Sequence, residues 1–390
     1  MDLEVKKRAL CIINWEYFWL CLCLLITLAM HLSIVTQVND LILDEAHYVK
    51  DARSIILTQY DQRPEHPPLG KLFLVAGIYA FGDNPWGWRM PCIIMGSISI
   101  ALLYIICRRL QMTRRGASIA TALFSFENFS FMIASVAMLD VFFLTLTLAF
   151  FALYLYRQYV LSGIFIGLAA LAKLFAAMAT PALVIHWFLT KTRQTRWFAL
   201  TIIVAPISLL ALIVIFDFAI NHQIENPITR ITNMLDLTRG LKFSNVNHPS
   251  LSRPWAWLLN FQPMAFWYNP NYYCILNPNI WLVIMPTALF LLYKTFKRDE
   301  SGLFGFAWFF STFVLWIPVS IITDRVSFVF YFYPSIGAIC LGLGLAADKI
   351  ILWLSFKSLR IKIPVWSGLT LFGLLHAGSF VLLSPVFFRT

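Results

Sequence analysis

Charged residues are scarce in this sequence of 390 residues. Only 13% of the residues are charged, 60% are hydrophobic and the mean hydropathy is +0.75. Several apolar runs reach the roughly 20 residues that a helix needs to cross a bilayer core. The short alternating strands of a membrane barrel are missing. The chain is therefore predicted to be an all-α polytopic membrane protein.

The sequence also lacks a cysteine pattern, low-complexity segments and an obvious internal repeat. Its seven Cys are scattered and lie mostly in apolar segments, without the spacing of a metal site or a disulfide framework. Small apolar packing residues are the favoured reading. No soluble domain is apparent, so residues 1–390 are predicted to form one transmembrane domain with two long outer loops, at about 37–87 and 220–279.

Eleven apolar stretches are predicted to span the membrane. The first is too long for the core of a signal peptide and lacks a clear cleavage site, so it is expected to be retained. The stretches are 17–36, 88–107, 117–134, 139–156, 159–175, 176–190, 197–219, 280–293, 302–321, 326–346 and 364–385.

Basic residues alternate between the connecting segments and predict the orientation of the chain. One set of segments holds 18 of the 30 Lys and Arg with six acids, and the other holds 12 with 13 acids. By the positive-inside rule the first set is cytoplasmic, as is the N-terminus. The basic segments are Lys6–Arg8, Arg108–Arg115, Arg157, Lys191–Arg196, Lys294–Arg298 and Lys349–Lys362. The net charge of +11 is thus a topology signal and predicts no nucleic-acid partner.

The most polar stretch, Leu41–Arg89, falls on the predicted extracytoplasmic side. It carries the pair Asp44 and Glu45 shortly after the first span, and the rigid run from His66 to Lys71. Solvated loop acids are the ordinary alternative for the pair. Arg89 stands at the mouth of a span, where a cation is costly in lipid and normally has an anionic partner.

Further charges lie in apolar surroundings at the outer ends of predicted spans: Asp140, Lys173 and Arg325. Helix capping is the alternative for Asp140, and extension of the amine to the interface is the alternative for Lys173. Together, cations at the lipid boundary would hold the phosphate of a lipid-linked donor, and a carboxylate would take a proton from an attacking hydroxyl. This arrangement predicts group transfer with a phosphate leaving group.

Ordered motifs carry a family resemblance. DEAHYVKDAR, EHPPLGK, FGDNPWGWRMPC, FENFSFMIASVAMLD, GLAALAKLF, HPSLSRPWAW, LNPNIW and RVSFVFYFYP follow one another between residues 44 and 334. In order and spacing they resemble the protein O-mannosyltransferases, GT-C membrane glycosyltransferases that use dolichyl-phosphate mannose. The resemblance implies a GT-C fold of eleven spans and an inverting single displacement.

The resemblance also implies roles for individual residues. Asp44 is implied as catalytic base, with Glu45 positioning acceptor or donor. Arg89 and Lys173 are implied as contacts of the donor phosphate, and Lys71 is added as a third contact because the rigid run from His66 presents this cation on the predicted outer face. The residues implied to belong to the site are Asp140, His248, Trp255 and Trp257, and the predicted outer face adds His66 and Arg325 as further site-lining candidates. Ser135 and Tyr331 replace an Arg and a His of the family pattern, and the second outer loop lacks room for a soluble repeat domain, which indicates a compact bacterial-type member.

The leading prediction is therefore an inverting transferase that moves a sugar, mannose by resemblance, from a polyprenyl phosphate to Ser or Thr of an extracytoplasmic protein. The nearest alternative is the same chemistry on a glycolipid, as in aminoarabinose transferases; a transporter is the remote one. The predicted partners are the lipid-linked donor, a protein acceptor and membrane lipids of the inner membrane. No cofactor, metal site or oligomeric state is predicted; a divalent metal near His47, His66 or His248 stays an open alternative without ligand spacing to support it.

Overall fold

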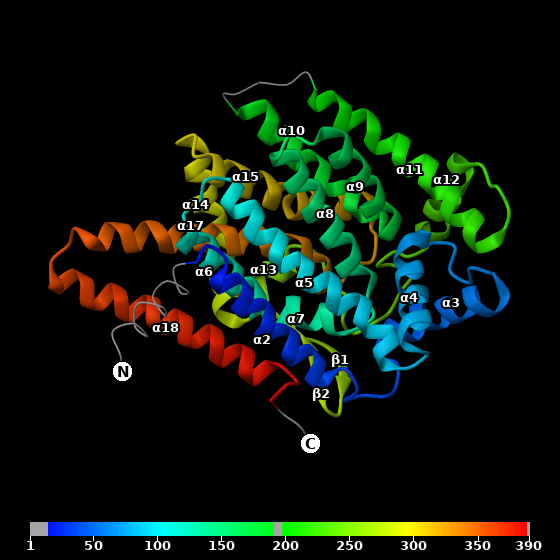
Figure 1. Ribbon diagram of the computed structural model, residues 1–390, viewed down its shortest axis with the longest axis horizontal. Helices are drawn as coiled ribbons and strands as arrows, with labels where there is room; N and C mark the ends of the chain where they lie inside the picture. Colours follow the sequence, from blue (N-terminus) through cyan, green and yellow to red (C-terminus); the bar gives the residue numbers. More distant parts are fainter. Residues whose placement is uncertain (1–14, 191–196, 388–390) are drawn as a thin grey trace.

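The computed structural model describes residues 15–190 and 197–387, and helices dominate them (Figure 1). The first half contains α2 (Phe18–Ile34), α3 (Glu45–Thr58), α4 (Pro68–Phe81), α5 (Pro85–Arg109), α6 (Arg114–Ser125), α7 (Asn128–Ser135), α8 (Leu139–Leu155), α9 (Tyr159–Ala172), η1 (Leu174–Ala179) and α10 (Thr180–Leu189). The second half contains α11 (Phe198–Asn221), α12 (Pro227–Arg239), α13 (Ala256–Leu259), β1 (Met264–Tyr268), β2 (Asn271–Cys274), α14 (Pro278–Phe296), α15 (Glu300–Phe309), η2 (Phe310–Val314), α16 (Trp316–Thr323), η3 (Val329–Phe332), α17 (Tyr333–Ser355) and α18 (Leu359–Leu383).

The prediction of a multi-pass membrane protein is confirmed. Within the described residues six helices are long and apolar enough to cross a bilayer, or seven if the pair α6–α7, bent by 58°, counts as one span. Shorter apolar helices supply further candidates. Each of the eleven predicted stretches coincides with helical segments, but several of these are shorter than about 20 residues, so the count of eleven crossings stays a prediction.

The two predicted outer loops contain regular structure. The first holds α3 and α4, and the second holds α12, α13 and the antiparallel hairpin β1–β2. Helix α3 buries Tyr48, Val49, Ala52 and Ile55, which share one face at helical spacing, so this face packs on the protein while Lys50 and Leu57 are exposed. Helix α4 begins with Pro68 in its first turn, where a missing N–H costs nothing.

The connecting segments gather at two opposite ends of the molecule. Arg115 pairs with Asp348 at 2.7 Å, and Lys349 lies 3.6 Å from Asp299, so three predicted cytoplasmic segments meet. Figure 1 shows the turn between α17 and α18 projecting at one side and α3, α4 and α12 at the other. This separation matches the alternation of charge in the sequence. The predicted basic clusters Lys6–Arg8 and Lys191–Arg196 lie outside the described residues.

Helix α8 runs through the core and places a carboxylate at its start. Almost all of its residues are buried, among them Phe142, Phe150 and Phe151, and it packs against α5 and α9. Helix α9 in turn lies very close to α11, since a Cβ on Gly167 would come within 2.2 Å of the Ser208 hydroxyl. This tight packing fixes Asp140, in the first turn of α8, relative to Lys173 at the end of α9.

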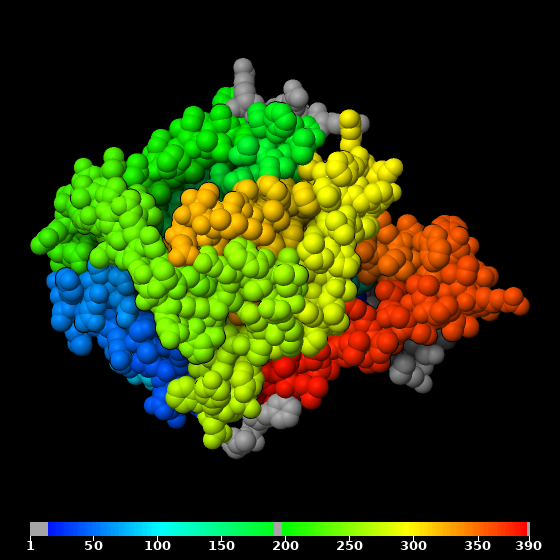
Figure 2. All heavy atoms as spheres, turned by 180° about the vertical axis from the view of Figure 1, so that it is seen from behind, coloured from blue at the N-terminus to red at the C-terminus, as the bar shows by residue number. Residues whose placement is uncertain are grey.

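The second outer segment covers one face of the protein. Figure 2 shows the yellow-green residues that follow α12 lying across this face, against the orange segment around α16. The backbone joins the two segments, since Lys242 pairs with Arg325 and Leu251 pairs with Phe328 as isolated bridges. The motif RVSFVFYFYP, residues 325–334, is thereby held against the second outer segment.

Candidate active site

Asp44 sits in a tight turn that leads into α3. The preceding residue, Leu43, has a φ of +44°, which a residue with a Cβ rarely adopts. Such strain persists where the surroundings hold it and is common at functional sites. The Asp44 side chain is half-buried, and its carboxylate makes no hydrogen bond or ion pair within the described residues. The turn therefore presents an unpaired carboxylate.

A fully buried ion pair fixes this turn. Glu45 receives two hydrogen bonds of 2.9 Å from the Arg89 guanidinium, one on each carboxylate oxygen. The same oxygens accept the backbone N–H of Ile42 at 2.8 Å and of Ala137 at 2.9 Å. Glu45 thus links the Asp44 turn to the chain that leads into Asp140. The anionic partner expected for Arg89 is the neighbour of the predicted base.

The remaining donors of Arg89 bind the end of the first span. They reach the carbonyl oxygens of Val35 at 2.8 Å, Val38 at 2.7 Å and Asp40 at 3.0 Å. All five N–H groups of this guanidinium are therefore used inside the protein. Arg89 acts here as a positioning residue for the Asp44 turn, whereas the sequence comparison with the family implied a phosphate contact.

Asp140 and Lys173 form a second pair beside Asp44. The amine of Lys173 donates to Asp140 at 2.7 Å, and the other oxygen of Asp140 is buried without a partner. The amine also lies 4.8 Å from the centre of the Tyr331 ring and 5.4 Å from that of Phe330. A cation over aromatic faces is stabilised there and keeps two of its three N–H donors for another ligand. Lys173 is therefore placed to bind an anion.

Burial and neighbouring charges shift the pKa values of Asp44 and His66. Burial, and the negative charge of Asp140, raise the pKa of Asp44 to about 6, although Lys173 and Arg63 oppose the shift. Burial next to Lys71, Lys173 and Arg63 lowers the pKa of His66 to about 3, so this imidazole is neutral at pH 7. Asp44 combines an elevated pKa with an ionised form at neutral pH, as a general base requires.

Lys71 belongs to a separate buried cluster. Its amine is completely buried, contacts Asp61 at 2.5 Å and Asp51 at 3.2 Å, and donates to the Arg63 carbonyl at 3.0 Å. Each of its donors has an acceptor in the protein. Lys71 thus holds the segment between α3 and α4 against α4, where the sequence reading had placed a phosphate contact.

The predicted residues of the second outer segment divide into core and surface. Trp257 is buried and donates to the Ser252 hydroxyl at 2.9 Å, whereas Trp255 is exposed. The exposed His248 packs edge-on against Phe328. Arg325 lies close enough to His66 to disfavour protonation of its ring. Trp257 supports the fold of this segment, and Arg325 borders the space beside His66.

Sequence reasoning missed three residues of this site. Tyr48 packs edge-on against His66 at 5.4 Å, and Arg63 contacts His47 at 2.7 Å and lies close enough to Asp44 to oppose the rise in the pKa of that carboxyl. Tyr331, noted only as a departure from the family pattern, contacts Lys173. Helical spacing from Asp44 could have indicated Tyr48, one turn later on α3. No group of three or more His, Cys, Asp or Glu in the described part of the chain is arranged to hold a metal ion.

Comparison with known proteins supports the motif evidence. A family model described as dolichyl-phosphate-mannose-protein mannosyltransferase matches residues 65–220. The polyprenol-phosphate-mannose–protein mannosyltransferase of Mycobacterium tuberculosis is 29% identical over 170 residues, 42% of this chain and 32% of the relative. The enzyme of the same name from Corynebacterium glutamicum is 23% identical and covers 84% of this chain and 81% of its own length.

The resemblance to the protein O-mannosyltransferases is confirmed. The match to the Mycobacterium tuberculosis mannosyltransferase spans only about a third of that protein. Among solved structures, the Saccharomyces cerevisiae protein O-mannosyltransferase Pmt1–Pmt2 complex bound to the sugar donor has a TM-score of 0.75 at 12% identity, covering 95% of this chain and 90% of that chain. ArnT from Cupriavidus metallidurans has a TM-score of 0.59 at 18% identity, covering 94% and 64%. The chain thus shares the GT-C fold of these membrane proteins.

Proposed function

We propose that this chain is an inverting glycosyltransferase that moves mannose from polyprenyl phosphate to a Ser or Thr hydroxyl of an extracytoplasmic protein. The observation that carries the proposal is the unpaired Asp44 carboxylate beside the Asp140–Lys173 pair. The names of the relatives supply the donor and the acceptor class. The whole chain, residues 1–390, acts as one transferase domain.

The residues support a single displacement. The acceptor hydroxyl oxygen forms the new bond to the anomeric carbon of mannose, and its proton passes to the Asp44 carboxylate. The bond between this carbon and the phosphate oxygen breaks, and its electron pair leaves with polyprenyl phosphate. Lys173 stabilises the charge that develops on this phosphate, and Asp140 holds the amine in place. Glu45 and Arg89 act through Asp44 as positioning residues.

Lys173 is proposed as the phosphate contact, because the donors of Arg89 and Lys71 are occupied within the protein. Replacing Lys173 by Met should lower kcat/KM for the donor by about 10- to 100-fold, since a hydrogen bond to a charged group is lost. Initial rates over a range of donor concentrations test this, with Lys173→Arg as the charge-conserving comparison. An unchanged dependence on donor concentration would rule out the assignment.

The elevated pKa of Asp44 predicts an acid limb in the rate profile. The carboxylate, which accepts the proton, is lost as the pH falls through about 6. Between pH 7 and pH 5 we expect kcat/KM to decrease about tenfold with a limiting slope of one. The donor is a phosphodiester and does not titrate in this range. A profile that stays flat down to pH 5, with the protein still folded, would contradict Asp44 as the base.

Labelled transfer in proteoliposomes tests the proposed function. Purified protein is supplied with radiolabelled polyprenyl-phosphate mannose, an acceptor polypeptide and a lipid extract, and the protein and lipid fractions are then separated. Label on Ser or Thr of the polypeptide supports the proposal. Label confined to a glycolipid would support the alternative acceptor class. The likeness to the ArnT fold is less specific evidence for that class. Donor that remains intact would overturn both.

We further propose that the end carrying α3, α4 and α12 faces away from the cytoplasm, with the N-terminus on the cytoplasmic side of the inner membrane. The segregation of the basic segments to the opposite end supports this orientation. A single Cys at the exposed position Gln59 should react with an impermeant maleimide added to intact, outer-membrane-permeabilised cells. Labelling only after lysis would reverse the orientation.

A further inference from the structure

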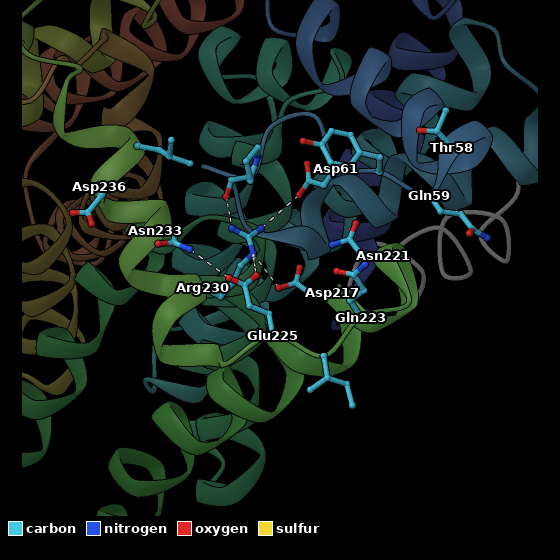
Figure 3. A pocket seen from close by; sticks show the side chains of 14 residues that line it. Thr58, Gln59, Asp61, Asp217, Asn221, Gln223, Glu225, Arg230, Asn233 and Asp236 are labelled. Carbon is cyan, nitrogen blue, oxygen red and sulfur yellow. Dashed lines mark hydrogen bonds and ion pairs between the residues drawn. The ribbon is translucent and has the colours of Figure 1, made fainter.

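A large cavity opens at the proposed outer end, and Asp44 is not among the residues that line it. Its volume is about 940 Å³, and its walls come from the end of α3, the segment that follows α3, the end of α11 and α12 (Figure 3). No step of the proposed sugar transfer uses it. We call it the acidic outer pocket, with Asp61, Pro64, Asp217, Glu225, Arg230 and Asp236 among its lining residues.

Carboxylates outnumber cations around this pocket. Four of its lining residues are carboxylates, and the cations that pair with them are Arg230, Lys71 and Arg239, which leaves one negative charge in excess among these seven residues. Arg230 is buried and lies 3.0 Å from Asp217, 3.6 Å from Asp61 and 3.9 Å from Glu225. Figure 3 shows these side chains converging on the guanidinium. Three carboxylates share Arg230, although Lys71 also holds Asp61, and Asp236 pairs with Arg239 at 2.7 Å.

A buried acceptor atom in the pocket has no partner. Asp217 is 3% exposed, and its second oxygen, Oδ1, makes no hydrogen bond within the described residues. The amide oxygen of Asn221, one turn later on α11, is likewise buried without a donor. Both residues line the cavity. Buried polar atoms are nearly always satisfied, so the pocket calls for a ligand that donates hydrogen bonds.

The pocket lies next to the proposed site of transfer. Asp61 and Pro64, which line it, flank Arg63, and Arg63 lies close enough to Asp44 to influence the pKa of that carboxyl. Asp61 also anchors Lys71 from the other side. The segment between α3 and α4 therefore separates the pocket from the Asp44 turn. An extended acceptor chain advances about 3.3–3.6 Å for each residue, so the separation of hydroxyl and basic side chain along the peptide sets whether both sites are occupied together.

We propose that the acidic outer pocket binds a Lys or Arg side chain of the acceptor polypeptide, a few residues away from the hydroxyl that receives the sugar. This inference rests on the proposed function and specifies its acceptor. A basic side chain supplies both the positive charge and the N–H donors that the pocket lacks. A divalent cation is disfavoured, because no group of metal-ligating residues among those described has suitable geometry.

The test uses the full-length protein with Glu225→Gln and Asp236→Asn combined. Both side chains are partly exposed, at 43% and 56%, so the fold is expected to tolerate their neutralisation. Two acceptor peptides are compared that differ only by Lys or Gln near the Ser or Thr. For the Lys peptide we expect KM to rise about three- to tenfold with kcat unchanged, and for the Gln peptide no change. Asp83→Asn, an exposed carboxylate paired with Arg53 outside the pocket, serves as the control.

A binding arm separates this inference from the proposed function. Fluorescence anisotropy of the labelled Lys peptide reports affinity even if no sugar is transferred. The proposal is supported if the Lys peptide binds more weakly to the double variant than to Asp83→Asn. Added salt should also weaken the binding of this peptide to the wild type. Equal KM and equal affinity for the two peptides in the wild type would overturn it while leaving the transferase intact. Unchanged affinity of the double variant for the Lys peptide would also overturn it.

Discussion

Replacing Asp44 by Asn should reduce kcat/KM for mannosyl transfer by about 10²- to 10⁴-fold, the usual contribution of a general base. The amide has nearly the same size as the carboxylate but cannot take the proton of the acceptor hydroxyl. No hydrogen bond within the described residues is lost, because the Asp44 carboxylate makes none there. Transfer of labelled mannose to peptide, measured below saturation, gives this ratio directly.

The same substitution, Asp44→Asn, should increase the stability of the fold or leave it unchanged. The raised pKa of Asp44 means that the folded chain binds its proton more tightly than the unfolded chain, so stability from this group is present at low pH and is lost as the pH rises through about 6. At pH 7 the ionised carboxylate opposes folding, and Asn removes that charge. The melting temperature of Asp44→Asn should therefore equal or exceed that of the wild type.

A matched control lies four residues upstream. Asp40 is exposed and also follows the first span, and its Asn variant changes the net charge in the same way. It should keep nearly full activity. If Asp44→Asn retains wild-type kcat/KM, or if Asp40→Asn loses as much, the Asp44 carboxylate is not the base.

Replacing Arg89 by Met should destabilise the fold by about 3–5 kcal/mol, the cost of leaving a buried charge without its partner. Glu45 is completely buried and would keep only its two backbone donors. The carbonyl oxygens of Val35, Val38 and Asp40 would also lose the guanidinium. Thermal unfolding in detergent measures the change, and activity should decrease further because the strained turn at Leu43 loses its support.

Arg53→Met provides the comparison for Arg89→Met. Arg53 pairs with Asp83 at 2.8 Å on the same outer segment, but both side chains are substantially exposed, and such pairs contribute about 0–1 kcal/mol. Equal stability of the two variants would show that Arg89 has no positioning role. An Arg89 variant that is stable but binds the donor poorly would restore the phosphate contact that the family resemblance implied.

Several features of the protein followed from local sequence. Apolar runs of bilayer length predicted a multi-pass helical protein, because an unpaired backbone cannot cross hydrocarbon and helices satisfy it internally. The ordered motifs from Asp44 to Pro334 predicted the family. An Arg at the mouth of a span predicted an anionic partner, which is Glu45. These conclusions depend on composition and order along the chain.

Other features required the packing of distant segments. The pairs Glu45–Arg89 and Asp140–Lys173 join residues 44 and 33 positions apart, and no local pattern states which acid meets which cation. Burial decided the rest: Lys71 and Arg89 use every donor inside the protein, while Lys173 keeps two. Cations that look alike in the sequence therefore differ in how many N–H donors they have left for a ligand.

The sequence by itself determined that this protein lies in the membrane, that it resembles protein O-mannosyltransferases, and that a carboxylate near the first span is the candidate base. The resemblance already distinguished Asp44 from Glu45, but only the tertiary structure gave the physical reason, by leaving the first unpaired and giving the second four hydrogen bonds. The same holds for the acidic outer pocket, whose walls come from α3, α11 and α12. The reason is that pKa and hydrogen-bonding capacity depend on burial and neighbours in space, which packing alone sets.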